Sequence, residues 1–167
     1  MFVPINGPVV ADTVYVDNKL VARDVAVTLP EVTPVTADLS AMGTFSLPIW
    51  QLIEHMETAL TKIGVDMGLA GIIKPDMKPL EFRWAQTVTD ANGKTKNVGC
   101  KAFINGIPNK LPGISLSVGE TSEGEVTIAT TRYNLFVDGE EAFLIDRLAG
   151  IVRIAGVNYT DEVSSML

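Results

Sequence analysis

Short runs of apolar and β-branched residues, separated by Gly, Pro, Asn or Asp, recur along most of the chain. This pattern is typical of antiparallel strands joined by turns. Residues 12–16 and 20–22 flank Asp17 and Asn18 and predict a hairpin, since both turn residues tolerate a positive φ. A third run at residues 25–29 ends at Pro30. We therefore expect the chain to begin as β-structure.

After Pro79 the same pattern continues almost to the end of the chain. Strand after strand with turn residues between them favours an antiparallel sandwich or a small barrel. The predicted strands span residues 80–89, 97–107, 114–118, 126–137, 142–146 and 151–154.

Residues 30–48 are poor in charge and are interrupted by Pro34, Gly43 and Pro48, which predicts a long loop. Loops of more than about 12–15 residues are usually functional or disordered. Apolar side chains on such a loop indicate that something else covers them. These side chains are Leu39, Met42, Phe45 and Leu47.

Residues 49–63 fit two patterns. The apolar positions follow a helical period, but the stretch from Met56 to Lys62 also alternates as a strand does. Asp66 is suited to cap a short helix that ends before Pro75, because the residue before a proline resists helical geometry.

Composition and charge narrow the classes of function. The chain has 167 residues, of which 47% are hydrophobic and 20% charged, as in one globular domain with a real core. Its formal net charge of −7 disfavours a domain that reads DNA or RNA, because such a field repels phosphate backbones. Cys100 is the only cysteine, so no internal disulfide is expected. Neither a signal peptide nor a membrane span is expected.

No combination of residues supports catalysis. His55 is the only histidine, and nothing in the sequence places it beside Cys100. One Cys and one His are too few for a zinc site, and residues 138–141 (DGEE) do not match a calcium loop. Glu54 and Glu57 fit a solvated face better than an acid–base pair. We expect no enzyme activity, no metal and no cofactor.

Several stretches resemble one known family. Residues 131–141 (TRYNLFVDGEE), 144–146 (LID) and 154–159 (IAGVNY), with residues 25–33 (VAVTLPEVT), resemble the major tail tube proteins of contractile-tailed bacteriophages. The resemblance covers nearly the whole chain in the family's order. Each motif alone is ordinary β-hairpin chemistry, so the specificity comes from their combination.

The resemblance implies a single tail tube domain over residues 1–167. Its fold would be a mainly β sandwich or barrel with one short α-helix and a long extended loop. The N-terminal segment 1–11 and the loop at residues 30–48 would be arms that reach neighbouring subunits. The same similarity aligns residues 66–73 with the family's helix and favours a strand at residues 55–63.

A structural role is also implied by the resemblance. Six subunits would form a ring, and rings would stack head-to-tail into the rigid inner tube of a contractile tail, the conduit for DNA when a head is present. The implied partners are further copies of the chain, the sheath, the baseplate initiator, the tail terminator and, transiently, the tape measure protein and DNA. The subunit would not insert into a membrane by itself. It would assemble in the bacterial host cytoplasm and reside in a virion tail or a phage-tail-like particle.

Alternate side chains would face the bore if strands near residues 55–63, 80–89, 98–107 and 125–137 form the inner sheet. A shift of one residue in register would reverse every assignment. An acidic or neutral bore would let DNA slide, whereas a basic bore would grip it. The charged candidates are Glu54, Glu57, Lys62, Glu81, Arg83, Lys101 and Glu125.

Two alternatives stay open. The chain could be the tube subunit of another contractile injection machine, such as an R-type bacteriocin or a type VI secretion system. A monomeric β-sandwich that binds a small ligand or carbohydrate is a different class, and it predicts a compact monomer with a short, ordered segment at residues 30–48.

Overall fold

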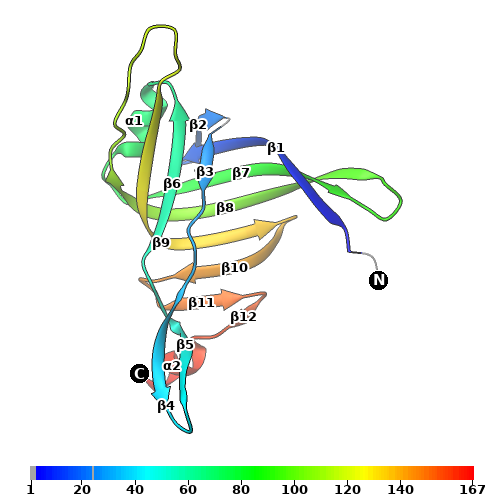
Figure 1. Cartoon of the computed structure of the whole chain (residues 1–167), viewed down its shortest axis with the longest axis vertical. Helices are drawn as coiled ribbons and strands as arrows, with labels where there is room; N and C mark the ends of the chain where they lie inside the picture. Colours follow the sequence, from blue (N-terminus) through cyan, green and yellow to red (C-terminus); the bar gives the residue numbers. More distant parts are fainter. Residues whose placement is uncertain (1–2, 24) are drawn as a thin grey trace.

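The structure, a computed structural model, describes residues 3–23 and 25–167 and is built mainly of β-strands (Figure 1). This confirms the mainly β class expected from the sequence. In the described ranges the elements are β1 (Ile5–Val16), β2 (Lys19–Arg23), β3 (Ala26–Thr28), β4 (Pro34–Ser40), β5 (Thr44–Ile53), β6 (Met56–Ile63), α1 (Met67–Ile73), β7 (Lys78–Thr89), β8 (Thr95–Lys110), β9 (Glu123–Val137), β10 (Glu140–Asp146), β11 (Ile151–Ile154), β12 (Val157–Asn158) and α2 (Asp161–Met166).

One antiparallel sheet contains all the strands except β4 and β5. Its main order is β12-β11-β10-β9-β8-β7-β1-β2, and β6 joins the edge of β9 and carries β3. The sheet curls until β2 and β3, which are consecutive in the chain, lie side by side (Figure 1). The carboxylate oxygens of Asp12 in β1 accept hydrogen bonds of 3.2 Å from the backbone N–H of Val25 at this junction. The result is a partly closed barrel.

Strand β9 bends at Thr131. In its pairing with β8, Arg132 lies opposite Asn105 and Thr130 lies opposite Gly106, so Thr131 is an extra residue, a β-bulge. Residues 123–130 of β9 pair with β6, and residues 132–137 pair with β10. The bulge therefore marks where β9 leaves the barrel and enters the second part of the sheet.

The apolar core fills the inside of the curl. Leu60 of β6, Ile104 of β8 and Ile128 of β9 are fully buried there. Helix α1 closes one end of the barrel with Leu69 and Ile72.

The predicted turn and helix are confirmed in detail. Asp17 and Asn18 have φ values of 49° and 62°, the left-handed conformation that a tight hairpin turn needs. The side chain of Asp66 caps α1 by accepting a 2.9 Å hydrogen bond from the N–H of Leu69. The helix ends at Ile73, before Pro75, and the strand expected at residues 55–63 is β6.

Residues 30–48 are not the long loop expected from the sequence. They contain β4 and the first half of β5, and these strands form a hairpin around a turn at Met42 and Gly43 with φ values of 54° and 124°. The two prolines that suggested a loop stand within the strands of this separate hairpin, where proline is tolerated because each strand has a free edge.

Two smaller predictions also need correction. Residues 114–118 are not a strand: they lie in the connection between β8 and β9, where the described chain offers them no pairing partner. A second helix, α2, forms near the C-terminus, with Asp161 and Glu162 placed favourably in its first turn. The inter-subunit arm expected at residues 1–11 stays a prediction: residues 5–11 belong to β1, and residues 1–2 lie outside the described part.

Candidate assembly surfaces

The β4–β5 hairpin extends away from the barrel (Figure 1). Residues directly opposite each other in an antiparallel pair lie on the same face. One face, the apolar hairpin face, consists of Val35, Ala37, Leu39, Phe45, Leu47 and Ile49. The other face, the polar hairpin face, consists of Thr36, Asp38, Ser40, Thr44, Ser46 and Pro48.

Solvent reaches the outer part of the apolar hairpin face. Leu39, Phe45 and Leu47 are 41%, 50% and 45% exposed. An isolated two-stranded hairpin is marginally stable in water, and it gains stability when one face packs against another surface. The arrangement therefore suits a contact with a second molecule.

Three of the four apolar residues expected to act together in this segment do share a face. Leu39, Phe45 and Leu47 lie on it, whereas Met42 stands fully exposed in the turn. Sequence reasoning missed Val35, Ala37 and Ile49. Their signal was the alternation of apolar and polar residues on both sides of Gly43.

The four strands expected to form a common sheet are adjacent, in the order β6-β9-β8-β7. One face of this sheet packs on the core, and we call the opposite one the free face. Five of the charged candidates have this orientation, because their neighbours along each strand are buried in the core. These five are Glu57, Glu81, Arg83, Lys101 and Glu125.

At the β6 end of the free face, polar side chains link neighbouring strands. Asn109 donates a 3.3 Å hydrogen bond to Glu57, and the Thr127 hydroxyl donates one of 2.5 Å to Asn109. Lys110 lies 3.1 Å from the carboxylate of Glu125. The acidic candidates here are thus partly neutralised within the chain.

Toward β1, Arg83 occupies the centre of a second cluster. Its Nε lies 2.5 Å from Oε1 of Glu81, and this hydrogen bond raises the pKa of Arg83. The guanidinium also lies 4.3 Å from the ring centroid of Tyr15. Lys101 is directly opposite Arg83 in the register, so two cations stand side by side.

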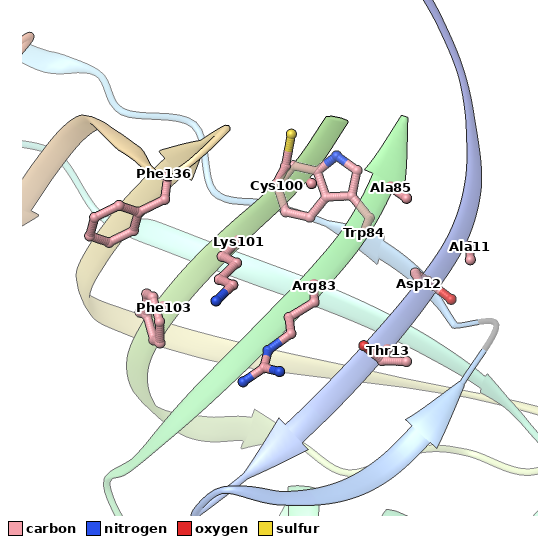
Figure 2. Close-up of a pocket in the computed structure, with 12 residues that line it drawn as sticks. Ala11, Asp12, Thr13, Arg83, Trp84, Ala85, Cys100, Lys101, Phe103 and Phe136 are labelled. Atoms are coloured by element: carbon pink, nitrogen blue, oxygen red, sulfur yellow. The ribbon is translucent and has the colours of Figure 1, made fainter. Parts of the chain in front are cut away.

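A hollow of about 580 Å³ lies over this cluster (Figure 2). Arg83 and Lys101 extend on the same side of the sheet as Phe103, while Trp84 and Cys100 point to the other side (Figure 2). The hollow thus joins an aromatic wall to two cationic tips. Such a surface can contact an anion, but it holds no nucleophile–base pair.

Two of the seven charged candidates do not lie on the free face. Lys62 is in β6 but on the core-facing side, where its ammonium lies 2.6 Å from the carboxylate of Asp66 beside α1. Glu54 is in the short connection between β5 and β6, outside both strands.

Ion pairs that sequence reasoning missed extend across β9, β10 and β11. Arg153 donates two hydrogen bonds to Glu141, of 2.6 and 3.0 Å, and the first of these contacts holds the pKa of Glu141 below its usual value. Arg132 lies 3.9 Å from Asp146. The register between strands that are distant in the sequence determines these ion pairs, so the local sequence does not predict them.

His55 and Cys100 occupy unlike environments. His55 is exposed between β5 and β6, with Nε2 3.9 Å from the carboxylate of Glu57. Cys100 is buried in β8 beside Val88 and Val98, and burial raises the pKa of its thiol. Within residues 3–23 and 25–167, no group of three or more His, Cys, Asp or Glu is placed to hold a metal ion.

Neither helix of the described chain is long and apolar enough to cross a membrane.

We compared the chain with known proteins and solved structures. None of the curated proteins matches this sequence. A chain of the sheath–tube complex of the extracellular contractile injection system PVC, in its extended state, is 15% identical, with a TM-score of 0.55 over 78% of this chain and 90% of that one. A chain of the tube-terminating cap of the anti-feeding prophage is also 15% identical, with a TM-score of 0.54 over 81% of this chain and 94% of that one. These likenesses establish a shared fold.

The family profile described as phage tail tube protein FII matches residues 10–167. The match includes the hairpin, the bulged strand β9 and the ion pairs of the free face. The chain therefore belongs to the family of phage tail tube protein FII.

Proposed function

We propose that the chain is the structural, non-enzymatic subunit of the hollow inner tube of a contractile tail or a phage-tail-like particle. Six copies would form a ring, and rings would stack head-to-tail. The tube would be the conduit for DNA when a head is present. Membership of the tail tube family supports this assignment, and the exposed apolar hairpin face is the structural observation that carries it.

The hairpin favours contacts between unlike surfaces. An arm that leaves its own barrel and buries its face on a neighbour makes a head-to-tail contact, and such contacts continue into rings or filaments. Related solved structures include a sheath–tube complex and a tube terminator. We accordingly propose the sheath and a terminator as partners. A baseplate initiator, a tape measure protein and transient DNA complete the proposed set.

We further propose that the free face of β6-β9-β8-β7 lines the bore. Its carboxylates, on Glu57, Glu81, Glu123 and Glu125, stand against the cations Arg83, Lys101 and Arg132. Glu81 already neutralises Arg83, and Lys110 faces Glu125. A nearly neutral wall would not release the counterions of DNA and would let the duplex slide.

Assembly is tested by negative-stain electron microscopy and sedimentation of the purified chain over a range of concentrations. The parent is expected to form rings or hollow tubes. Leu47→Asp places a charge on the apolar hairpin face and should prevent assembly. Thr44→Asp places the same charge on the polar hairpin face and should leave assembly unchanged.

Circular dichroism of both variants checks that the barrel still folds. If the unmodified chain stays monomeric, even when seeded with purified tail tubes or baseplates, the tube assignment is wrong. That result would favour the monomeric ligand-binding module instead.

The bore assignment is tested in assembled, headed particles. Glu57→Lys with Glu125→Lys should slow DNA ejection, because a basic wall grips the phosphate backbone. Glu31→Lys is the matched control, since Glu31 lies outside the four strands. Unchanged ejection in the double variant would contradict the assignment.

The related folds come from extracellular contractile injection systems, and this favours a headless particle as the second candidate. Particles isolated with this subunit would then lack packaged DNA. Nuclease-protected DNA in such particles distinguishes the two machines.

A further inference from the structure

Two nearly uncharged stretches lie at opposite ends of the long axis of the molecule (Figure 1). One is the β4–β5 hairpin, where residues 32–53 carry Asp38 as their only charge. The other is the connection between β8 and β9, where residues 111–119 carry no charge. The chain as a whole carries −7. Identical acidic surfaces repel, so two copies meet most readily through these two ends.

The connection has the alternation of a strand, but no strand of the described chain pairs with it. Ile114, Leu116 and Val118 alternate with serines, and they are 39%, 80% and 108% exposed. The root of the connection is held by a 2.8 Å hydrogen bond from Gly64 N–H to the carbonyl of Ser122. An apolar row is thus anchored at its base and left open at its tip.

We propose that residues 114–118 of one copy pack on the apolar hairpin face of the next copy along the tube. This inference rests on the self-assembly proposed above and assigns one of its contacts. Each surface is apolar, nearly uncharged and open to solvent. Because the two lie at opposite ends of the molecule, one contact repeated from copy to copy extends a stack without closing it.

Cross-linking between two differently marked chains tests the contact. Both chains carry Cys100→Ala to remove the native thiol. Leu47→Cys is placed in one chain and Leu116→Cys in the other, which also carries a size tag. After co-assembly, a short bismaleimide should give a cross-linked species that contains both chains. Thr36→Cys on the polar hairpin face is the matched control and should give little of that species.

A second variant tests the contact without engineered thiols. Leu116→Asp with Val118→Asp should abolish stacking and leave the unfolding midpoint of the monomer unchanged, because both side chains lie outside the core. Tubes that form without the mixed cross-link, or that form from the double Asp variant, overturn this contact and leave the proposed function standing. A parent that never assembles, even when seeded, overturns both.

Discussion

The side-chain oxygens Oγ1 of Thr58 and Thr130 lie 2.7 Å apart in the middle of the apolar core. Thr58 is 0% exposed and Thr130 is 1% exposed. The Thr130 hydroxyl donates to the carbonyl of Ile128, at 3.2 Å, so the Thr58 hydroxyl donates to Thr130. This pair ties β6 to β9 by side chains as well as by backbone, at the part of the barrel that carries the free face.

Removing either hydroxyl should have unequal effects. Thr58→Val leaves the Thr130 hydroxyl with its carbonyl acceptor, so a loss of about 1 kcal/mol is expected. Thr130→Val strands the Thr58 hydroxyl without an acceptor and should cost about 1–3 kcal/mol. The double variant should cost less than the two single changes added together. Urea unfolding of the monomers measures all three, and equal single effects that add would contradict this arrangement.

Local chemistry made parts of the fold predictable from the sequence. The turn at Asp17 and Asn18 and the cap at Asp66 depend on a few consecutive residues, and both form as expected. The hairpin of β4 and β5 could also have been recognised, since Val35 and Leu47 belong to clear alternations. We predicted a loop because of its two prolines, but proline is tolerated in a strand that has an exposed edge.

The features that could not be predicted depend on contacts between residues far apart in the sequence. The bulge at Thr131 arises where β8 and β9 approach closely, and no local sequence pattern predicts it. Lys62 alternates with the core residues of β6, but its charge suggested the free face; its ammonium instead contacts Asp66, the cap of α1. Residues 114–118 have a strand pattern but pair with no strand among residues 3–23 and 25–167. Sequence pattern therefore predicted elements better than it predicted their neighbours.

Lys78 should be needed to hold the C-terminal end of α1. Its residue is 7% exposed, and its ammonium donates to the carbonyls of Gly71 and Lys74, the latter at 3.0 Å. These carbonyls lack partners within the helix. Lys78→Met should cost about 1–3 kcal/mol in urea unfolding, because the Gly71 carbonyl loses this donor and the Lys74 carbonyl keeps only the N–H of Asp76, at 2.8 Å. Lys74→Met, at an exposed lysine on the same turn, should change the free energy by less than about 0.5 kcal/mol.

Asp66 should make stability depend on acid pH. The hydrogen bond from Lys62, and then that from the Leu69 N–H, lower the pKa of Asp66 below its ordinary 3.8. A carboxyl of this kind stabilises the fold fully above pH 3.8 and loses this contribution as the pH falls through its lowered pKa. Asp66→Asn keeps a capping oxygen but no charge.

The Asp66→Asn variant should therefore unfold at lower urea than the parent at neutral pH. The gap should shrink once the pH falls well below 3.8, where the parent carboxyl is also neutral. The test is to measure the urea unfolding midpoints of both proteins across this pH range. A gap that stays constant with pH would mean that the charge of Asp66 has no part in the stability of α1.

Gly106 should be the least replaceable glycine of β8. A Cβ built there would lie 2.5 Å from the carbonyl oxygen of Ala129 and 2.7 Å from a methyl carbon of Ile128. The nearer atom is backbone, so the clash is relieved only if β8 and β9 separate at the bulge. Gly106→Ala should therefore cost at least about 1–3 kcal/mol in urea unfolding. It should also speed amide exchange selectively at residues 104–108.

Gly99 is the matched control in the same strand, because nothing lies within 4 Å of a Cβ added there. Gly99→Ala should keep the parent's stability or raise it by up to about 1 kcal/mol, since it reduces the freedom of the unfolded chain. If Gly106→Ala proved as stable as Gly99→Ala, that result would contradict the close approach of β8 and β9 at Gly106. The bulge would then not explain how β9 passes from β6 to β10.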